Sequence, residues 1–129
     1  MSNQPECVIQ PDGSFCDSYK GVLGDDSLRH IVEVMIFNRV FEKRMLLLQR
    51  QGRIGFSLTS TGEEGIIIGA THCLKFDDPI FLSYRELGSL LYRGVPLKRI
   101  VNQFYGNSRD YCKGRQMPVH YCFKDYHIP

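Results

Sequence analysis

Tryptophan and long apolar runs are both missing from this chain of 129 residues. A membrane-spanning helix needs about 20 consecutive apolar residues, and the longest runs here, Met45 to Leu48 and Ile66 to Ala70, are far shorter. The N-terminus has neither the charged-then-apolar pattern of a signal peptide nor an Arg-rich transit pattern. We therefore expect no membrane span, and either an intracellular protein or an organellar one that lacks its targeting segment.

A charge excess is missing as well, since 16 basic and 14 acidic residues give a formal net charge of +2. Proteins that bind nucleic acid usually concentrate basic residues on one face. The basic residues here are spread along the chain, so we expect no nucleic-acid partner. The five cysteines are odd in number and include no Cys-x-x-Cys pair, a pattern that favours reduced thiols over a disulfide framework.

The signatures of phosphate loops and zinc sites are also absent. Gly62, Gly65 and Gly69 are not followed by the Gly-Lys-Ser/Thr that ends a P-loop. They predict a helix start and a close approach of another backbone at Gly65 and Gly69. Four possible metal ligands near the C-terminus have spacings that match no standard zinc pattern; they are Cys112, His120, Cys122 and His127. We expect no metal ligand among them.

What the sequence does contain is a set of helix signals. An irregular arm of residues 1–25 precedes the first helix, and Thr61 and Glu64 form a capping-box pattern before the second. The four predicted helices run from Leu28 to Gln51, from Gly62 to Leu74, from about Tyr84 or Arg85 to Arg93, and from Leu97 to Tyr105. Apolar residues cover more than half of the circumference of the first helix, which predicts burial on more than one side.

Only one segment, about residues 80–83, predicts a clear strand. A single strand cannot form a sheet. Two alternatives follow: a helical fold with one extended connector, or a fragment that lacks the strands with which this one pairs. The end of the chain in mid-loop, at His127-Ile128-Pro129, favours the fragment.

The main candidate site is the corner where this strand runs into a helix, Ile80 to Gly88. Open α/β sheets bind ligands at the carboxyl ends of their strands, and free N–H groups at a helix N-terminus attract phosphate. Arg85 could contact phosphate oxygens through two N–H groups, and Tyr84 could supply a hydroxyl or stack on a ring. The alternative is that Arg85 and Glu86 are surface charges of a first helical turn.

The loop Lys113 to Tyr121 is the second candidate. It combines two cations, an amide, a proline and a His-Tyr pair in a segment too long to be a simple connector. We consider two interpretations, a basic loop in solvent and a loop that lies over a site or against a partner subunit.

Six segments, in order and with plausible spacings, resemble the alpha subunit of thiamine-diphosphate-dependent 2-oxo acid dehydrogenases. They are LQRQGRIGF, TGEEG, FLSYRELG, LYRGVPL, YGN and KGRQMPVHY, and the similarity covers about residues 28–126. The last segment is more similar to the branched-chain branch of the family than to the pyruvate branch.

The resemblance implies an α/β fold, of which residues 26–129 are the N-terminal, mostly helical portion of a thiamine-diphosphate-binding domain that is truncated at its C-terminus. It also implies a heterotetramer with a beta subunit, thiamine diphosphate at the interface between the subunits, and transfer of the acyl group to the lipoyl arm of an acyltransferase component. The mitochondrial matrix and the bacterial cytoplasm are the compartments that it implies. Carried over to this chain, Tyr84 and Arg85 contact the diphosphate of the cofactor, and Ser83 occupies the adjoining position.

Several family motifs are absent from this sequence: the metal-diphosphate motif Gly-Asp/Glu-Gly with its later Asn, the downstream catalytic histidine, and the segment Ser-x-Pro-Leu-x-Thr-Gln. We therefore expect magnesium to be held by residues outside this chain. We also expect the isolated chain neither to hold thiamine diphosphate tightly nor to turn over substrate, and its surplus apolar surface to lie against the missing sheet and partner subunits. The alternative function is a non-catalytic helical interaction module or truncated paralogue, which the wide apolar stripe of residues 28–51 supports.

Overall fold

The computed structural model describes residues 11–14 and 21–129. These residues belong to two units, 1–30 and 31–129, which we describe separately. In the first unit, Asp12 Oδ1 accepts a hydrogen bond of 2.9 Å from the backbone N–H of Ser14. The first helix begins at Asp25, and its first turn contains two acidic residues, which suit the positive end of the helix dipole.

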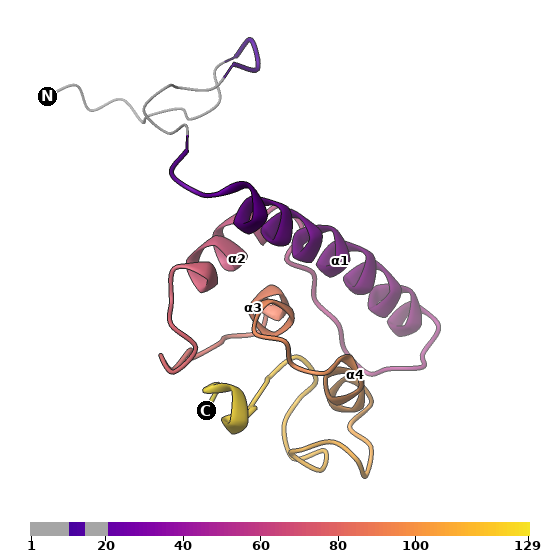
Figure 1. The fold of residues 1–129 in the computed structure, drawn as a ribbon. Coiled ribbons are helices and arrows are strands. Elements are labelled where there is room, and N and C mark those ends of the chain that lie inside the picture. The colour runs from indigo at the N-terminus through magenta and orange to yellow at the C-terminus, as the bar shows by residue number, and fades with distance from the viewer. Residues whose placement is uncertain (1–10, 15–20) are drawn as a thin grey trace, which may run out of the picture. The chain divides into compact units, whose positions relative to one another are not determined.

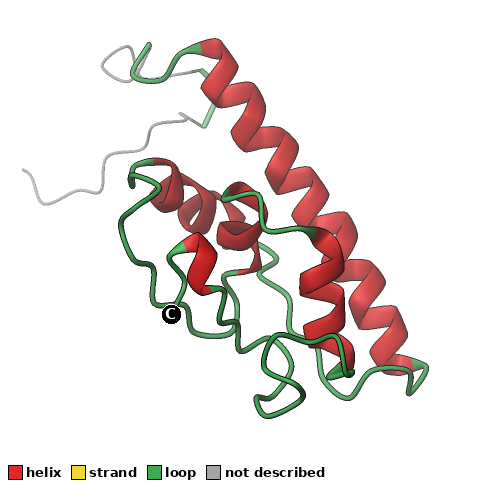
Figure 2. Cartoon of the chain, turned by 60° about the horizontal axis from the view of Figure 1, so that its bottom comes forward, coloured by secondary structure: helices red, strands yellow, loops and turns green. Residues whose placement is uncertain are grey.

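The elements of the described chain are helical. They are α1 (Asp25–Arg50), α2 (Glu64–His72), α3 (Leu87–Tyr92), α4 (Leu97–Tyr105) and a 3-10 helix, η2 (Lys124–Tyr126). All four predicted helices are confirmed, and α4 has the predicted bounds. The three short helices lie on one side of α1 (Figures 1 and 2). None of the helices in the described residues is long and apolar enough to cross a membrane.

The predicted strand at residues 80–83 is wrong: within residues 11–14 and 21–129 there is no strand (Figure 2). The segment is extended, but Ile80 N–H donates a hydrogen bond of 2.9 Å to the carbonyl of His127, which is not part of a strand. Ser83 N–H donates instead to the side chain of Glu86. A ladder needs a partner strand alongside, and the described β-pairing is an isolated bridge between Phe123 and Ile128.

The predicted capping box before α2 is also wrong. The helix begins two residues later than predicted, with Glu63 at the N-cap and no side-chain cap bond. Glu64 does accept a backbone hydrogen bond, 2.7 Å, but from Gly62 rather than from Thr61. Its other oxygen binds Arg39 of α1 at 2.7 Å, and this ion pair competes with the capping geometry.

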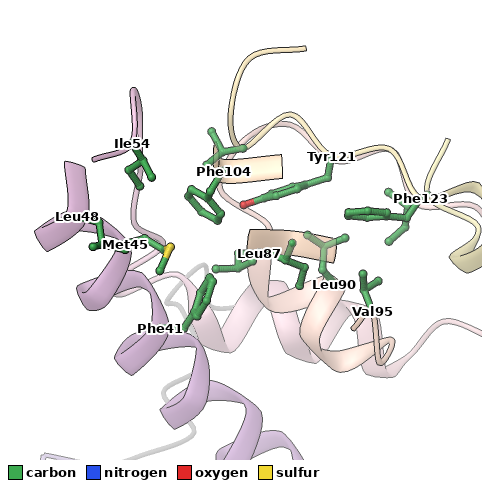
Figure 3. Close-up of a cluster of buried hydrophobic side chains, with 13 residues drawn as sticks. Phe41, Met45, Leu48, Ile54, Leu87, Leu90, Val95, Phe104, Tyr121 and Phe123 are labelled. Carbon is green, nitrogen blue, oxygen red and sulfur yellow. The ribbon is translucent and has the colours of Figure 1, made fainter. Parts of the chain in front are cut away.

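The core of residues 31–129 joins α1, α3, α4 and the C-terminal segment (Figure 3). The ring of Phe104 on α4 lies 5.9 Å from that of Phe41 on α1 and 6.4 Å from that of Tyr121. Phe123 stacks on Tyr121 from the other side of the cluster at 6.4 Å. The C-terminal segment, for which the sequence pattern predicted no element, therefore completes the core.

One face of α1 is buried at regular helical spacing, and it includes two polar residues. The buried residues are Ile31, Val34, Asn38, Phe41, Glu42, Met45 and Leu48. A second apolar face is exposed: Val32, Ile36 and Val40 are 50%, 61% and 63% accessible. The broad apolar stripe is thus confirmed, but only one of its sides is covered within the described part of the chain.

Close backbone packing occurs at a different glycine from those predicted. A Cβ atom added to Gly69 would meet no atom within 4 Å, and one added to Gly65 would only reach Met35 Cε at 4.0 Å. At Gly88 in α3, an added Cβ would lie 2.8 Å from Cγ1 of Ile68 in α2. Ile68 is completely buried, so its side chain has no free space into which to move. Gly88, rather than Gly69, allows α2 and α3 to pack together.

We predict opposite effects for alanine at these two glycines. Gly88→Ala should lower the free energy of unfolding by about 1–3 kcal/mol, because the added methyl overpacks a filled contact. Gly69→Ala should raise it by about 0.5–1 kcal/mol, because alanine has the higher helix propensity and meets no neighbour. Urea denaturation followed by circular dichroism measures both, and a Gly88→Ala variant as stable as the wild type would contradict the close packing.

Candidate functional site

The predicted site residues Ser83, Tyr84 and Arg85 form an exposed corner between the extended segment and α3. The guanidinium carbon of Arg85 lies 5.9 Å from the centre of the Tyr84 ring, within the range of a cation–π contact. Arg85 Nη1 donates a hydrogen bond of 3.3 Å to the carbonyl of Thr59 and lies 3.8 Å from a carboxylate oxygen of Glu63. The corner thus presents one cation and one phenol hydroxyl to an incoming ligand.

Two backbone N–H groups of this corner are already hydrogen-bonded. Glu86 Oε2 accepts hydrogen bonds from the N–H groups of Ser83, at 2.9 Å, and Arg85, at 3.2 Å. Glu86 is the N-cap of α3, which begins at Leu87 rather than at Tyr84 or Arg85. A carboxylate of the chain itself therefore occupies two of the N–H groups that were expected to attract an anion. The exposed side chains of Tyr84 and Arg85 remain available to an anion.

The loop of residues 113–121 reaches the same corner. The ring of His120 lies 6.2 Å from the ring of Tyr84. Gln103 of α4 holds this loop, because its amide donates to the carbonyls of Met117 (2.8 Å) and His120 (3.2 Å) and accepts from Val119 N–H (2.9 Å). His120 thus lies beside the corner, whereas residues 113–117 of the same loop are exposed. Both interpretations of the loop stay predictions.

Beneath the corner, a buried polar network joins α1 to the turn before α2. Ser60 N–H donates to both carboxylate oxygens of Glu42, at 3.1 and 2.9 Å, and its hydroxyl donates to Glu42 Oε1 at 2.8 Å. Asn38 Nδ2 donates to the same hydroxyl at 2.8 Å. Burial raises the pKa of Glu42, and the hydrogen bonds from Ser60 and Asn38 oppose that shift.

A second carboxylate, Glu64, is buried beside the same turn and is paired. Burial by itself raises the pKa of Glu64, but hydrogen bonds from its own backbone, from Arg39 and from Gly62 outweigh burial and leave that pKa below its usual value. Two acidic side chains thus end up in contrasting states. Glu64 has a cationic partner, whereas the donors to Glu42 among the described residues are neutral.

The described residues contain no group of three or more His, Cys, Asp or Glu side chains that could hold a metal ion. His120 points its Nδ1 toward the carbonyl of Pro118 at 3.2 Å, and Cys112 donates to Gln116 Oε1 at 2.9 Å. His127 lies 3.6 Å from a carboxylate oxygen of Asp77. The thiols of Cys73, Cys112 and Cys122 are free, and the other two cysteines lie outside the described ranges.

Sequence reasoning missed three residues around the corner: Thr59, Ser60 and Glu63. They belong to a loop with no periodic pattern, and their role depends on contacts across 18 to 26 positions of sequence. His120 was included in the second candidate loop, although only as half of a His-Tyr pair and without a contact to Tyr84.

Most of the chain is similar to known proteins. A family model described as the dehydrogenase E1 component matches residues 32–128. The 2-oxoisovalerate dehydrogenase subunit alpha 1 of Arabidopsis thaliana, named as mitochondrial, is 56% identical over 73 residues, which cover 57% of this chain and 16% of that protein. The human mitochondrial subunit alpha is 52% identical over 80 residues (62% and 18%), and that of Caenorhabditis elegans 51% identical over 77 residues (60% and 18%). The chain spans less than a fifth of the length of these relatives.

Proposed function

Because the chain belongs to the dehydrogenase E1 component family, matched over residues 32–128, we propose that it serves as part of the alpha subunit of a thiamine-diphosphate-dependent 2-oxo acid dehydrogenase. The substrate is a branched-chain 2-oxo acid, which is oxidatively decarboxylated. Identities of 51–56% to 2-oxoisovalerate dehydrogenase alpha subunits support this branch of the family. The names of those relatives also support the mitochondrial matrix as the compartment, with the bacterial cytoplasm as the alternative.

The corner of Tyr84 and Arg85 is the observation that carries the proposal. Arg85 is the cation available to the diphosphate of thiamine diphosphate, because its side chain is 43% exposed and its partners are a carbonyl and an exposed carboxylate. A guanidinium pairs with phosphate oxygens through two parallel N–H groups. Tyr84 donates its hydroxyl to the same anion, and Ser83 offers a second hydroxyl beside it.

When bound, thiamine diphosphate supplies the nucleophilic carbon that adds to the 2-oxo group and accepts the electron pair left by carbon dioxide. The residues of this chain bind and orient its diphosphate end. The described residues provide no metal cluster, so we assign magnesium to residues beyond those described here. His120 lies beside Tyr84, with ring centres 6.2 Å apart, and is a further side chain at the corner.

A beta subunit and a lipoyl-bearing acyltransferase component are the proposed partners. The exposed apolar face of α1 supports the need for a partner, because an apolar groove there is lined by Val32, Met35, Ile36, Val40 and the stem of Arg39. Exposed apolar patches of this kind mark interaction sites. The rival, a non-catalytic interaction module, uses the same face, so only cofactor binding distinguishes the two functions.

Calorimetric titration with thiamine diphosphate and magnesium tests the proposal. We expect the complex of this chain with a branched-chain beta subunit to bind the cofactor, and Arg85→Gln to weaken that binding about 30-fold, as expected for loss of one partner of a charge pair. Arg44→Gln removes an equal charge from an exposed position on α1 and should leave the affinity within about twofold. The isolated chain should bind more weakly than micromolar. A complex that binds no cofactor would favour the interaction module, and equal affinities for the two variants would overturn the role of Arg85 in holding the diphosphate.

A further inference from the structure

Ser60 is completely buried and is hydrogen-bonded in four directions. Its N–H and its hydroxyl both donate to Glu42, and its hydroxyl accepts from Asn38. Its carbonyl accepts a bond of 2.7 Å from the N–H of Glu63. These bonds fix the main chain of the turn of residues 59–63 against α1.

The turn of residues 59–63 also contacts the guanidinium of Arg85, through two of its residues. The carbonyl before Ser60, on Thr59, accepts from Arg85 Nη1 at 3.3 Å, and the carboxylate of Glu63 lies 3.8 Å away. No hydrogen bond or ion pair among the described residues joins Arg85 directly to Asn38, Glu42 or Ser60. Any influence of Asn38, Glu42 and Ser60 on the guanidinium must pass through the position of this turn.

Burying the carboxylate of Glu42 is unfavourable, because no cation among the described residues pairs with it. Transferring a charged group from water to the interior is unfavourable, and burial correspondingly raises the pKa of Glu42. An apolar side chain of similar volume would often be more stabilising at such a position. The carboxylate does fix the position of Ser60, because its two oxygens accept hydrogen bonds from both the backbone N–H and the hydroxyl of that residue.

We propose that Asn38, Glu42 and Ser60 are positioning residues, which hold the turn of residues 59–63 so that Arg85 is oriented for a diphosphate anion. The inference rests on the proposed function, since it assumes that Arg85 binds the diphosphate. Held by the Thr59 carbonyl, the guanidinium loses less side-chain freedom when the anion binds. Loosening the turn therefore weakens anion binding without removing any group that touches the anion.

The sign of the effect separates positioning from simple electrostatics. Replacing Glu42 with methionine removes a negative charge, which by Coulomb's law alone strengthens the binding of any nearby anion. Positioning predicts the opposite, a weaker affinity, because Ser60 N–H and the Ser60 hydroxyl lose their acceptors. Glu42→Gln keeps an acceptor and a donor at the same place, so positioning predicts a small change for this variant.

The experiment is a titration of the 129-residue chain with inorganic pyrophosphate, followed by nuclear magnetic resonance of the Arg85 Nε–H and of the backbone N–H groups of residues 83–86. We expect Glu42→Met to raise the dissociation constant about fivefold. Ser60→Ala, which keeps the backbone bond and loses only the hydroxyl, should raise it less and serves if Glu42→Met does not fold. Thr71→Val is the control: it removes a buried hydroxyl that donates to the carbonyl of Ile67 at 2.8 Å within α2, and it should leave the affinity unchanged.

A double-mutant cycle with Arg85→Gln completes the test. If the three residues act through Arg85, Glu42→Met should have no further effect on pyrophosphate affinity in the Arg85→Gln chain, while it lowers stability there as much as in the wild type. Unchanged affinity in Arg85→Gln alone would overturn the proposed diphosphate site. Weaker affinity in Arg85→Gln, together with Glu42→Met and Ser60→Ala variants that bind like Thr71→Val, would overturn the positioning inference and leave the diphosphate site standing.

Discussion

Replacing Arg93 with methionine should lower the free energy of unfolding by about 3 kcal/mol. Arg93 Nη1 donates to the carbonyl of Tyr126 at 2.8 Å, and Nη2 donates to the carbonyls of Lys75 at 3.1 Å and Asp78 at 2.6 Å. The residue is 8% exposed. The three acceptors are part-buried carbonyls, so each one that loses its donor costs about 1 kcal/mol, the low end of the cost of an unsatisfied acceptor.

The hydrogen bonds of Arg93 connect α3 to two segments that are distant in sequence. The guanidinium of Arg93 joins the end of α3 to the turn of residues 75–78 and to η2 near the C-terminus, and it lies 5.8 Å from the centre of the Phe76 ring. Burial lowers the pKa of Arg93, and the nearby Asp78 and Asp77 oppose that shift. The guanidinium therefore bridges three parts of the chain that share no strand or helix.

Chemical denaturation at neutral pH measures this effect, with two control variants. Arg93→Lys keeps the charge but cannot reach all three carbonyls with a single ammonium group, so we expect an intermediate loss of about 1–2 kcal/mol. Lys98→Met removes a cation from an exposed position on α4 and should change stability by less than about 0.5 kcal/mol. A loss below 1 kcal/mol for Arg93→Met would contradict the bridging role.

The sequence predicted those parts of the fold whose signals lie within the segment itself, and it failed where the structure depends on contacts between distant residues. The bounds of α4 follow from Pro96 and Gly106, whose signals lie within the segment itself; Gly106 has φ 55°, the left-handed conformation that glycine adopts most easily. The role of Arg93 had no such signal. Its acceptors are main-chain carbonyls 15 to 33 positions away, and a carbonyl is present at every residue.

The same reasoning explains the outcome at the candidate site. Tyr84 and Arg85 were identified because they follow an apolar segment closely, and because the sequence segments around them resemble those of the dehydrogenase family. Glu42 and Ser60 are 18 positions apart, and Glu42 falls on what the apolar pattern marked as a core stripe of α1. A polar residue at a core position of a helix is the sequence feature that should prompt a search for a buried partner.

Phe104→Ala should give the largest loss of stability, about 4 kcal/mol, because it removes a large side chain at the centre of the core. Phe104 is 1% exposed and contacts the rings of Phe41 on α1 and Tyr121 near the C-terminus (Figure 3). The cavity that alanine leaves would lie where α1, α4 and the C-terminal segment meet. Aromatic edge contacts to both neighbours are lost in addition to the buried area.

The next residue along α4 provides the matched control for this prediction. Tyr105→Ala removes an aromatic side chain of similar size, but Tyr105 is 41% exposed, so we expect a loss of less than about 1 kcal/mol. Both substitutions put alanine near the end of the same helix, so any gain in helix propensity is shared between them. Thermal and urea denaturation should therefore separate the two variants by at least about 3 kcal/mol. Equal stabilities would mean that α1, α4 and the C-terminal segment are held together by contacts other than this ring.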